Sequence, residues 1–169
     1  DLEMIRWSAM LGAVEALENG STAIVDHHES PNAIEGSLDV IAEACAEVGI
    51  RSLLAYGITD RHGPDGARRG LAENERFIRA GGRGLVGIHA AFTCSDASLE
   101  EAAGLAADLG VGVHIHVCEG VGDVEAQHLG GDGELGRRLQ GVLHHRRRRG
   151  QDDLCAFGFK RLSNRPCHA

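Results

Sequence analysis

Two histidines and a glutamate lie close together in residues 111–120 (VGVHIHVCEG), where an apolar stretch ends. Side chains alternate along a β-strand, so His114 and His116 are expected to point to the same face. A neutral imidazole is a good ligand for zinc or iron. Glu119 can reach a metal-coordinated water and take a proton from it. The spacing predicts a water-activating metal site, although HxxE alone also fits a structural histidine followed by a solvated glutamate.

The rest of the chain alternates between patterns typical of helices and of buried strands. Apolar, strand-like runs begin near residues 22, 51, 85 and 111, and an amphipathic helical pattern precedes each of them. The apolar residues of the first helix recur at intervals of three and four positions: Met4, Trp7, Leu11, Val14 and Leu17. A unit of about thirty residues with apolar strands predicts a parallel α/β sheet covered by helices.

Two architectures fit this alternation: a doubly wound open sheet, or part of a (β/α)8 TIM barrel. Both place functional residues at the carboxyl ends of the strands. The polar side chains that could bind a metal or take part in catalysis fall at these strand ends: Asp26, His27, His28, Thr59, Asp60, His89, His116 and Glu119. The first strand–helix turn carries no GxGxxG, and no GxxxxGK[ST] occurs in the chain, which argues against a nucleotide-binding open sheet. A complete barrel takes about 250 residues, so 169 residues supply only part of one.

Composition favours a cytoplasmic protein. The five cysteines are scattered and contain no CxxC pair, which argues against a disulfide framework or a zinc ribbon. No apolar run reaches the roughly 20 residues that a membrane span needs, and the first residues lack the pattern of a signal peptide. The chain begins at Asp1 rather than Met, as expected for a part of a longer protein.

Charge changes abruptly along the chain. Residues 1–136 carry 8 Arg against 23 Asp and Glu, whereas residues 137–169 carry 9 Arg and Lys against 2 Asp. Residues 128–169 also lack helical or strand periodicity. This irregular basic tail has three interpretations: a sixth strand with His144 as a ligand, a nucleic-acid-binding arm, or translation out of the natural reading frame. We favour the last, because four arginines follow His145 and would oppose a dication.

Three segments together resemble the amidohydrolase superfamily: residues 20–39 (GSTAIVDHHESPNAIEGSLD), 87–96 (GIHAAFTCSD) and 114–120 (HIHVCEG). The similarity is to its cytosine/guanine deaminase and chlorohydrolase branch, including aminohydrolases linked to selenium metabolism. It runs in order over residues 1–127. The resemblance implies a domain that comprises about strands 2–5 of a (β/α)8 barrel with their helices.

The resemblance also implies roles for individual residues. His116 matches the metal ligand on the fifth barrel strand, and Glu119 matches the acid/base that carries a proton from water to the leaving group. His89 matches a histidine that faces the substrate. His114 and the Asp26–His28 segment are expected near the pocket; His27 and His28 are not expected to be ligands, because the paired HxH of the family lies on its first strand. The implied cofactor is a divalent metal, zinc or iron.

The expected parent reaction is metal-assisted hydrolysis of a non-peptide C–N bond in a small purine-, pyrimidine- or triazine-like molecule. No membrane or nucleic-acid partner is expected, whereas open strand edges favour a homo-oligomer. The family site also needs HxH on the first strand, His on the sixth and Asp on the eighth, so His116 alone predicts weak or no metal binding and an inactive isolated chain. The alternative is a non-catalytic α/β binding module with a basic, nucleic-acid-binding tail.

Overall fold

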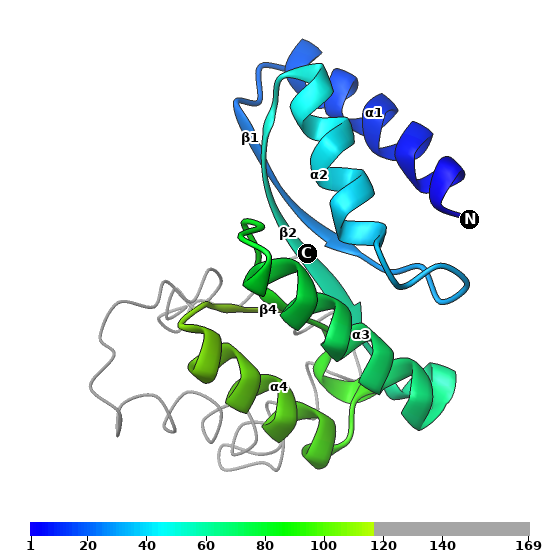
Figure 1. Cartoon of the computed structure of the whole chain (residues 1–169), viewed down its shortest axis with the longest axis vertical. Helices are drawn as coiled ribbons and strands as arrows, with labels where there is room; N and C mark the ends of the chain where they lie inside the picture. Colours follow the sequence, from blue (N-terminus) through cyan, green and yellow to red (C-terminus); the bar gives the residue numbers. More distant parts are fainter. Residues whose placement is uncertain (117–169) are drawn as a thin grey trace, which may run out of the picture.

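A computed structural model describes residues 1–116, in which four parallel strands alternate with four α-helices (Figure 1). The strands are β1 (Ala23–His28), β2 (Arg51–Ile58), β3 (Val86–Ala90) and β4 (Val113–His116). The helices are α1 (Leu2–Glu18), α2 (Ser37–Val48), α3 (Gly63–Arg79) and α4 (Asp96–Leu109), with 3-10 turns η1 (Asp60–His62) and η2 (Ala91–Thr93). The expectations for Glu119, for the boundary at residue 127 and for the basic tail lie outside the described residues.

Strand order identifies the architecture. The four strands lie in the order β1-β2-β3-β4, and all neighbours are parallel. Because each crossover joins adjacent strands with the same hand, every helix falls on one face of the sheet. A doubly wound sheet reverses its strand order and carries helices on both faces. The predicted partial (β/α)8 barrel is therefore confirmed, and the doubly wound alternative is excluded.

The core lies between the outer face of the sheet and the helices. Leu54, Tyr56 and Ile58 alternate along β2 and are all buried on this face. Leu54 and Tyr56 pack with residues of α1 and α2, whereas Ile58 packs with β3, β4 and α4. The opposite face of the sheet forms the inside of the curled half-barrel, and the alternate residues of each strand point to it.

Two polar side chains attach α3 to this core. Asn74 is buried; its Oδ1 accepts a hydrogen bond from the Tyr56 amide at 2.8 Å, and its Nδ2 donates to the Tyr56 carbonyl at 2.8 Å. Glu73 is only 1% exposed and accepts hydrogen bonds from the backbone amides of Gly36 and Leu38. Both residues satisfy backbone groups that would otherwise be buried without partners.

The first helix forms as predicted, but it packs differently from its apolar pattern. Asp1 caps α1 by accepting a hydrogen bond from the Met4 amide at 3.0 Å. Met4 and Trp7 are 70% and 60% exposed, while Ala13 is buried in the cluster shared with α2. Small residues bring α1 and α2 together, and the larger apolar stripe faces away from them. Within residues 1–116, no helix is long and apolar enough to cross a membrane.

Candidate metal centre

Four histidines gather on the inner face of the sheet, near the carboxyl ends of the strands. His27 comes from β1, His89 from β3, and both His114 and His116 from β4. The ring of His27 lies 4.7 Å from that of His114 and 4.5 Å from that of His116, centroid to centroid. His114 and His116 are 5.5 Å apart, as their predicted common face requires. His89 lies further out, 6.3 Å from His116 and 6.5 Å from His27.

Three of these rings offer nitrogen atoms close enough to share an ion. One nitrogen each from His27, His114 and His116 lies within 4.8 Å of the others. Nδ1 of His116 donates a hydrogen bond to the carbonyl oxygen of His89 at 2.9 Å, which leaves the Nε2 lone pair of His116 free. Imidazole nitrogens are donors that both zinc and iron accept. The donor set therefore fits the divalent metal that the sequence predicted.

The protonation state of the inner rings also suits ligation. Burial, together with the neighbouring imidazoles of His114 and His116, lowers the pKa of His27 to about 3. Burial also lowers the pKa of His114, and the nearby His116 acts in the same direction. Both rings are neutral at pH 7, so each keeps one nitrogen lone pair that can bind a metal ion or accept a hydrogen bond.

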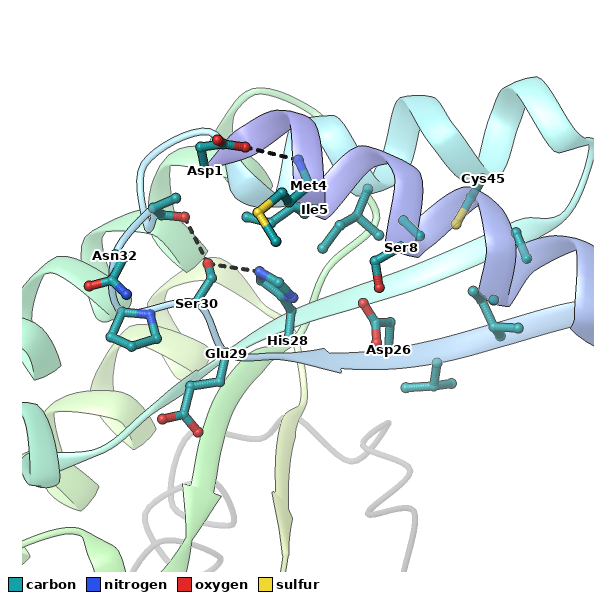
Figure 2. Close-up of a pocket in the computed structure, with 18 residues that line it drawn as sticks. Asp1, Met4, Ile5, Ser8, Asp26, His28, Glu29, Ser30, Asn32 and Cys45 are labelled. Carbon is teal, nitrogen blue, oxygen red and sulfur yellow. Dashed lines mark hydrogen bonds between the residues drawn. The ribbon is translucent and has the colours of Figure 1, made fainter.

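Asp26 and His28 lie on the other face of β1 from His27, as alternation requires. They line a cavity of about 620 Å³ between α1 and β1, together with Ser8 and Cys45 (Figure 2). Burial raises the pKa of Asp26 and lowers that of His28. These two predicted pocket residues therefore border a separate cavity and do not join the histidine cluster.

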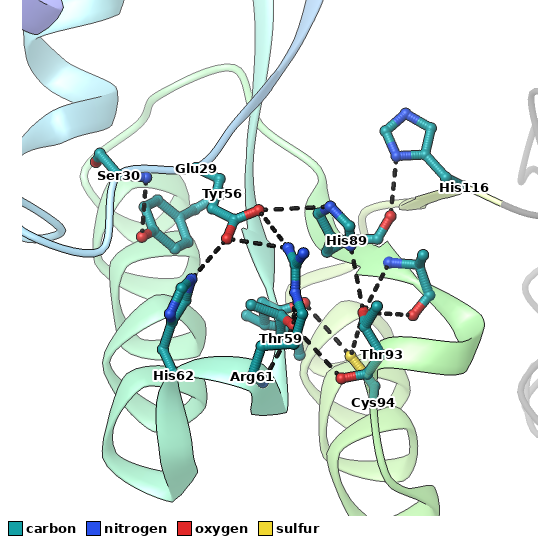
Figure 3. Close-up of polar contacts among 12 residues, drawn as sticks. Glu29, Ser30, Tyr56, Thr59, Arg61, His62, His89, Thr93, Cys94 and His116 are labelled. Carbon is teal, nitrogen blue, oxygen red and sulfur yellow. Dashed lines mark hydrogen bonds and ion pairs between the residues drawn. The ribbon is translucent and has the colours of Figure 1, made fainter. Parts of the chain in front are cut away.

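A carboxylate that the sequence did not single out organises the rim of the cluster (Figure 3). Glu29 follows β1 directly and accepts hydrogen bonds from Arg61 at 3.1 and 3.3 Å. Its Oε1 lies 2.8 Å from Nε2 of His62, and its Oε2 lies 3.5 Å from Nε2 of His89. The other ring nitrogen of His89 contacts the Thr93 hydroxyl at 3.3 Å. The position of Glu29, one residue beyond a strand, was the available signal.

The fold and the cluster together define a class: a parallel (β/α) barrel protein with imidazole donors at the carboxyl ends of its strands. Comparison with known proteins narrows this class to one family. Residues 1–145 match the profile of the amidohydrolase family, and the chain belongs to that family. The resemblance seen in the sequence is thereby confirmed.

Two relatives have high identity over most of the chain. A 5'-deoxyadenosine deaminase of Methanopyrus kandleri is 39% identical over 125 residues, which are 70% of this chain and 27% of the relative. A 5-methylthioadenosine/S-adenosylhomocysteine deaminase of Symbiobacterium thermophilum is also 39% identical, over 128 residues, 72% of this chain and 28% of the relative. The chain thus spans less than a third of the length of these curated relatives.

Solved structures share the fold. A zinc-bound adenosine deaminase from Xanthomonas campestris superposes with a TM-score of 0.66 at 21% identity, covering 84% of this chain and 32% of the other. The zinc complex of an atrazine chlorohydrolase from Arthrobacter aurescens gives a TM-score of 0.66 at 21% identity, covering 84% of this chain and 36% of the other. At such identities the likeness establishes the barrel architecture alone.

Proposed function

We propose that this chain supplies part of the active site of a metal-dependent hydrolase that releases ammonia from a non-peptide C–N bond. The observation that carries this proposal is the placement of His116, which is held by the His89 carbonyl at 2.9 Å among neutral imidazoles on the inner face of the barrel. Membership of the amidohydrolase family supports it, as do the names of the two deaminase relatives.

In this proposal His116 is a metal ligand through Nε2, and its Nδ1–H bond to the His89 carbonyl fixes both the tautomer and the ring orientation. A divalent ion held there would supply Lewis-acid activation of water, whose pKa it would lower to about 7. Glu119 would be the acid/base that takes a proton from the attacking water and gives it to the departing amine. His89 contacts the substrate, with Glu29 and Thr93 holding its two ring nitrogens.

The substrate class in this proposal is a purine carried by a nucleoside, because the two relatives at 39% identity are both named as adenosine-type deaminases. The triazine hydrolases share only the fold at 20–22% identity, so they give weaker support for a triazine. Zinc is the preferred ion, although imidazole ligands suit iron as well. A cytoplasmic location stays a prediction from cysteine usage.

The test is a chimera. The segment of the Methanopyrus kandleri deaminase that aligns with this chain is replaced by the corresponding residues of this chain, and ammonia release from 5'-deoxyadenosine is measured. We expect a zinc-dependent rate, which His116→Ala abolishes and Glu119→Gln lowers by at least ~100-fold. Thermal unfolding of each chimera establishes that it is folded.

Glu75→Gln on the exposed side of α3 is the matched control and should leave the rate unchanged. A folded, zinc-loaded chimera that releases no ammonia would contradict the proposed function. So would a rate that persists in both the His116 and the Glu119 variants.

A further inference from the structure

His27 and His114 meet across the whole width of the sheet. β1 and β4 are the two outer strands, and three strand spacings of about 4.8 Å would hold them about 14 Å apart if the sheet were flat. Their Nδ1 atoms are nevertheless only 3.2 Å apart. The curl of the half-barrel therefore directs both rings to one point on its inner face.

A glycine on β2, Gly57, leaves the space that the His27 ring occupies. Gly57 of β2 pairs with Gly87 of β3, and Gly87 pairs in turn with His114 of β4. A Cβ atom at Gly57 would lie 2.4 Å from Nε2 of His27. Any larger residue at this position would displace the His27 ring, so the glycine is required for the observed approach.

The nitrogen positions suit a shared ion. Zinc–nitrogen bonds of about 2.0–2.1 Å at tetrahedral angles place two ligand nitrogens about 3.3 Å apart. The Nδ1 atoms of His27 and His114 already lie at 3.2 Å. One ring nitrogen of His116 lies within 4.8 Å of one ring nitrogen of His27 and one of His114, a distance that side-chain rotation can shorten. The hydrogen bond from Nδ1 of His116 to the His89 carbonyl leaves its Nε2 for the ion.

We propose that His27, His114 and His116 together form a three-histidine site for a divalent transition-metal ion such as Zn²⁺, built entirely within residues 1–116. Without an ion, one Nδ1 of the His27–His114 pair must donate to the other, and Nε2 of His27 has no hydrogen-bond partner among the described residues. An ion uses both Nδ1 lone pairs at once. The site differs from the ligand set expected from the sequence, in which His116 was the single ligand of this chain.

The inference shares His116 with the proposed function, but it requires no turnover. It is tested on the 169-residue chain, stripped of metal with a chelator and titrated with Co²⁺, whose visible absorption strengthens in a four-coordinate site. We expect saturation at one ion per chain and displacement of Co²⁺ by Zn²⁺. Imidazole nitrogen chemical shifts of the unmodified protein should move for three histidines on addition of Zn²⁺, and this readout needs no variant to fold.

Variants identify the ligands. The affinity for the metal ion should fall by at least ~100-fold in each of three variants: His27→Ala, His114→Ala and His116→Ala. His62→Ala, on the outer side of Glu29, should leave affinity unchanged, as should the double replacement of His144 and His145. Circular dichroism establishes that each variant keeps its secondary structure.

The outcomes separate this inference from the proposed function. Failure of the chain to bind Co²⁺ overturns the three-histidine site, as does binding that is lost only when His144 and His145 are replaced. A deaminase chimera that needs His116 but tolerates His27→Ala and His114→Ala would support the proposed function while overturning the site. A chimera that binds one metal ion through these three histidines but releases no ammonia would support the three-histidine site and contradict the proposed function.

Discussion

Oε2 of Glu29 lies 3.5 Å from Nε2 of His89, and the same carboxylate binds Arg61 and His62. Glu29, which directly follows β1, thus links η1 to the carboxyl end of the strand β3. The arrangement restrains the His89 ring from one side while Thr93 contacts it from the other.

Replacing Glu29 should therefore free the His89 ring with little effect on stability. In the deaminase chimera, Glu29→Ala should raise KM by about tenfold, which corresponds to about 1.4 kcal/mol of lost substrate binding. The free energy of unfolding should fall by no more than about 1 kcal/mol, because the Glu29–Arg61 pair is partly exposed. Steady-state kinetics and chemical denaturation measure the two effects. An unchanged KM, with Glu75→Ala as the comparison, would mean that Glu29 does not position His89.

Gly57→Ala should weaken metal binding although it removes no ligand. The added methyl group would overlap Nε2 of His27 and rotate that ring away from His114. We expect an affinity loss of about tenfold or more, the size found when groups that orient a ligand are removed. Gly104→Ala is the matched control, because a Cβ there meets no atom within 4 Å. Equal affinities for the two alanine variants would contradict the proposed packing.

Asn74→Ala should destabilise the fold by about 3 kcal/mol, because it leaves the buried amide and carbonyl of Tyr56 without their side-chain partner. The regular pairing of β2 with β3 begins only at Gly57, so no neighbouring strand replaces the lost bonds. Glu75→Ala on the same helix breaks an exposed ion pair with Arg79 and should cost less than about 1 kcal/mol. Urea denaturation separates the two. A similar small loss for both variants would refute the role of Asn74.

Stability without metal should decrease as the pH falls below 6.5. The pKa of His27 is lowered from 6.5 to about 3 by burial, so between these values the unfolded chain binds a proton that the folded chain excludes. His28 and His114 act in the same direction, whereas the raised pKa of Asp26 acts in the opposite one.

His27→Gln should remove its share of this dependence. Unfolding measured in chelator at pH 7.5 and pH 5 should show a smaller loss of stability for the variant than for the unmodified chain. Equal losses would mean that His27 is not held neutral in the folded state.

The sequence predicted the alternation of helices and strands, because each strand contains or adjoins a short apolar run and the apolar residues of each helix recur every three or four positions. It also predicted the common face of His114 and His116, which follows from the period of a strand. The apolar stripe of α1 was misleading about packing: Trp7 is exposed, and Ala13 makes the buried contact. Periodicity fixes which residues share a face, but the neighbouring elements decide which face is buried.

The sequence placed His27 near the pocket, but it did not predict that its ring would contact those of His114 and His116. This contact depends on the curl of the sheet and on the absence of a side chain at Gly57, neither of which strand periodicity describes. The sequence also did not predict the burial of Glu73 and Asn74, since this burial depends on hydrogen bonds to backbone groups of other elements. Contacts between residues that are distant along the chain, such as His27 and His114, can be predicted only when the pairing and curl of the strands are known.

A crystal structure of the zinc-soaked chain, with an anomalous difference map at the zinc edge, tests the central claim most directly. We predict one strong peak bonded to Nε2 of His116 and to Nδ1 of His27 and His114, at about 2.0–2.1 Å from each. A map in which zinc lies only on other histidines, with the His116 ring turned away from His27, would contradict the account.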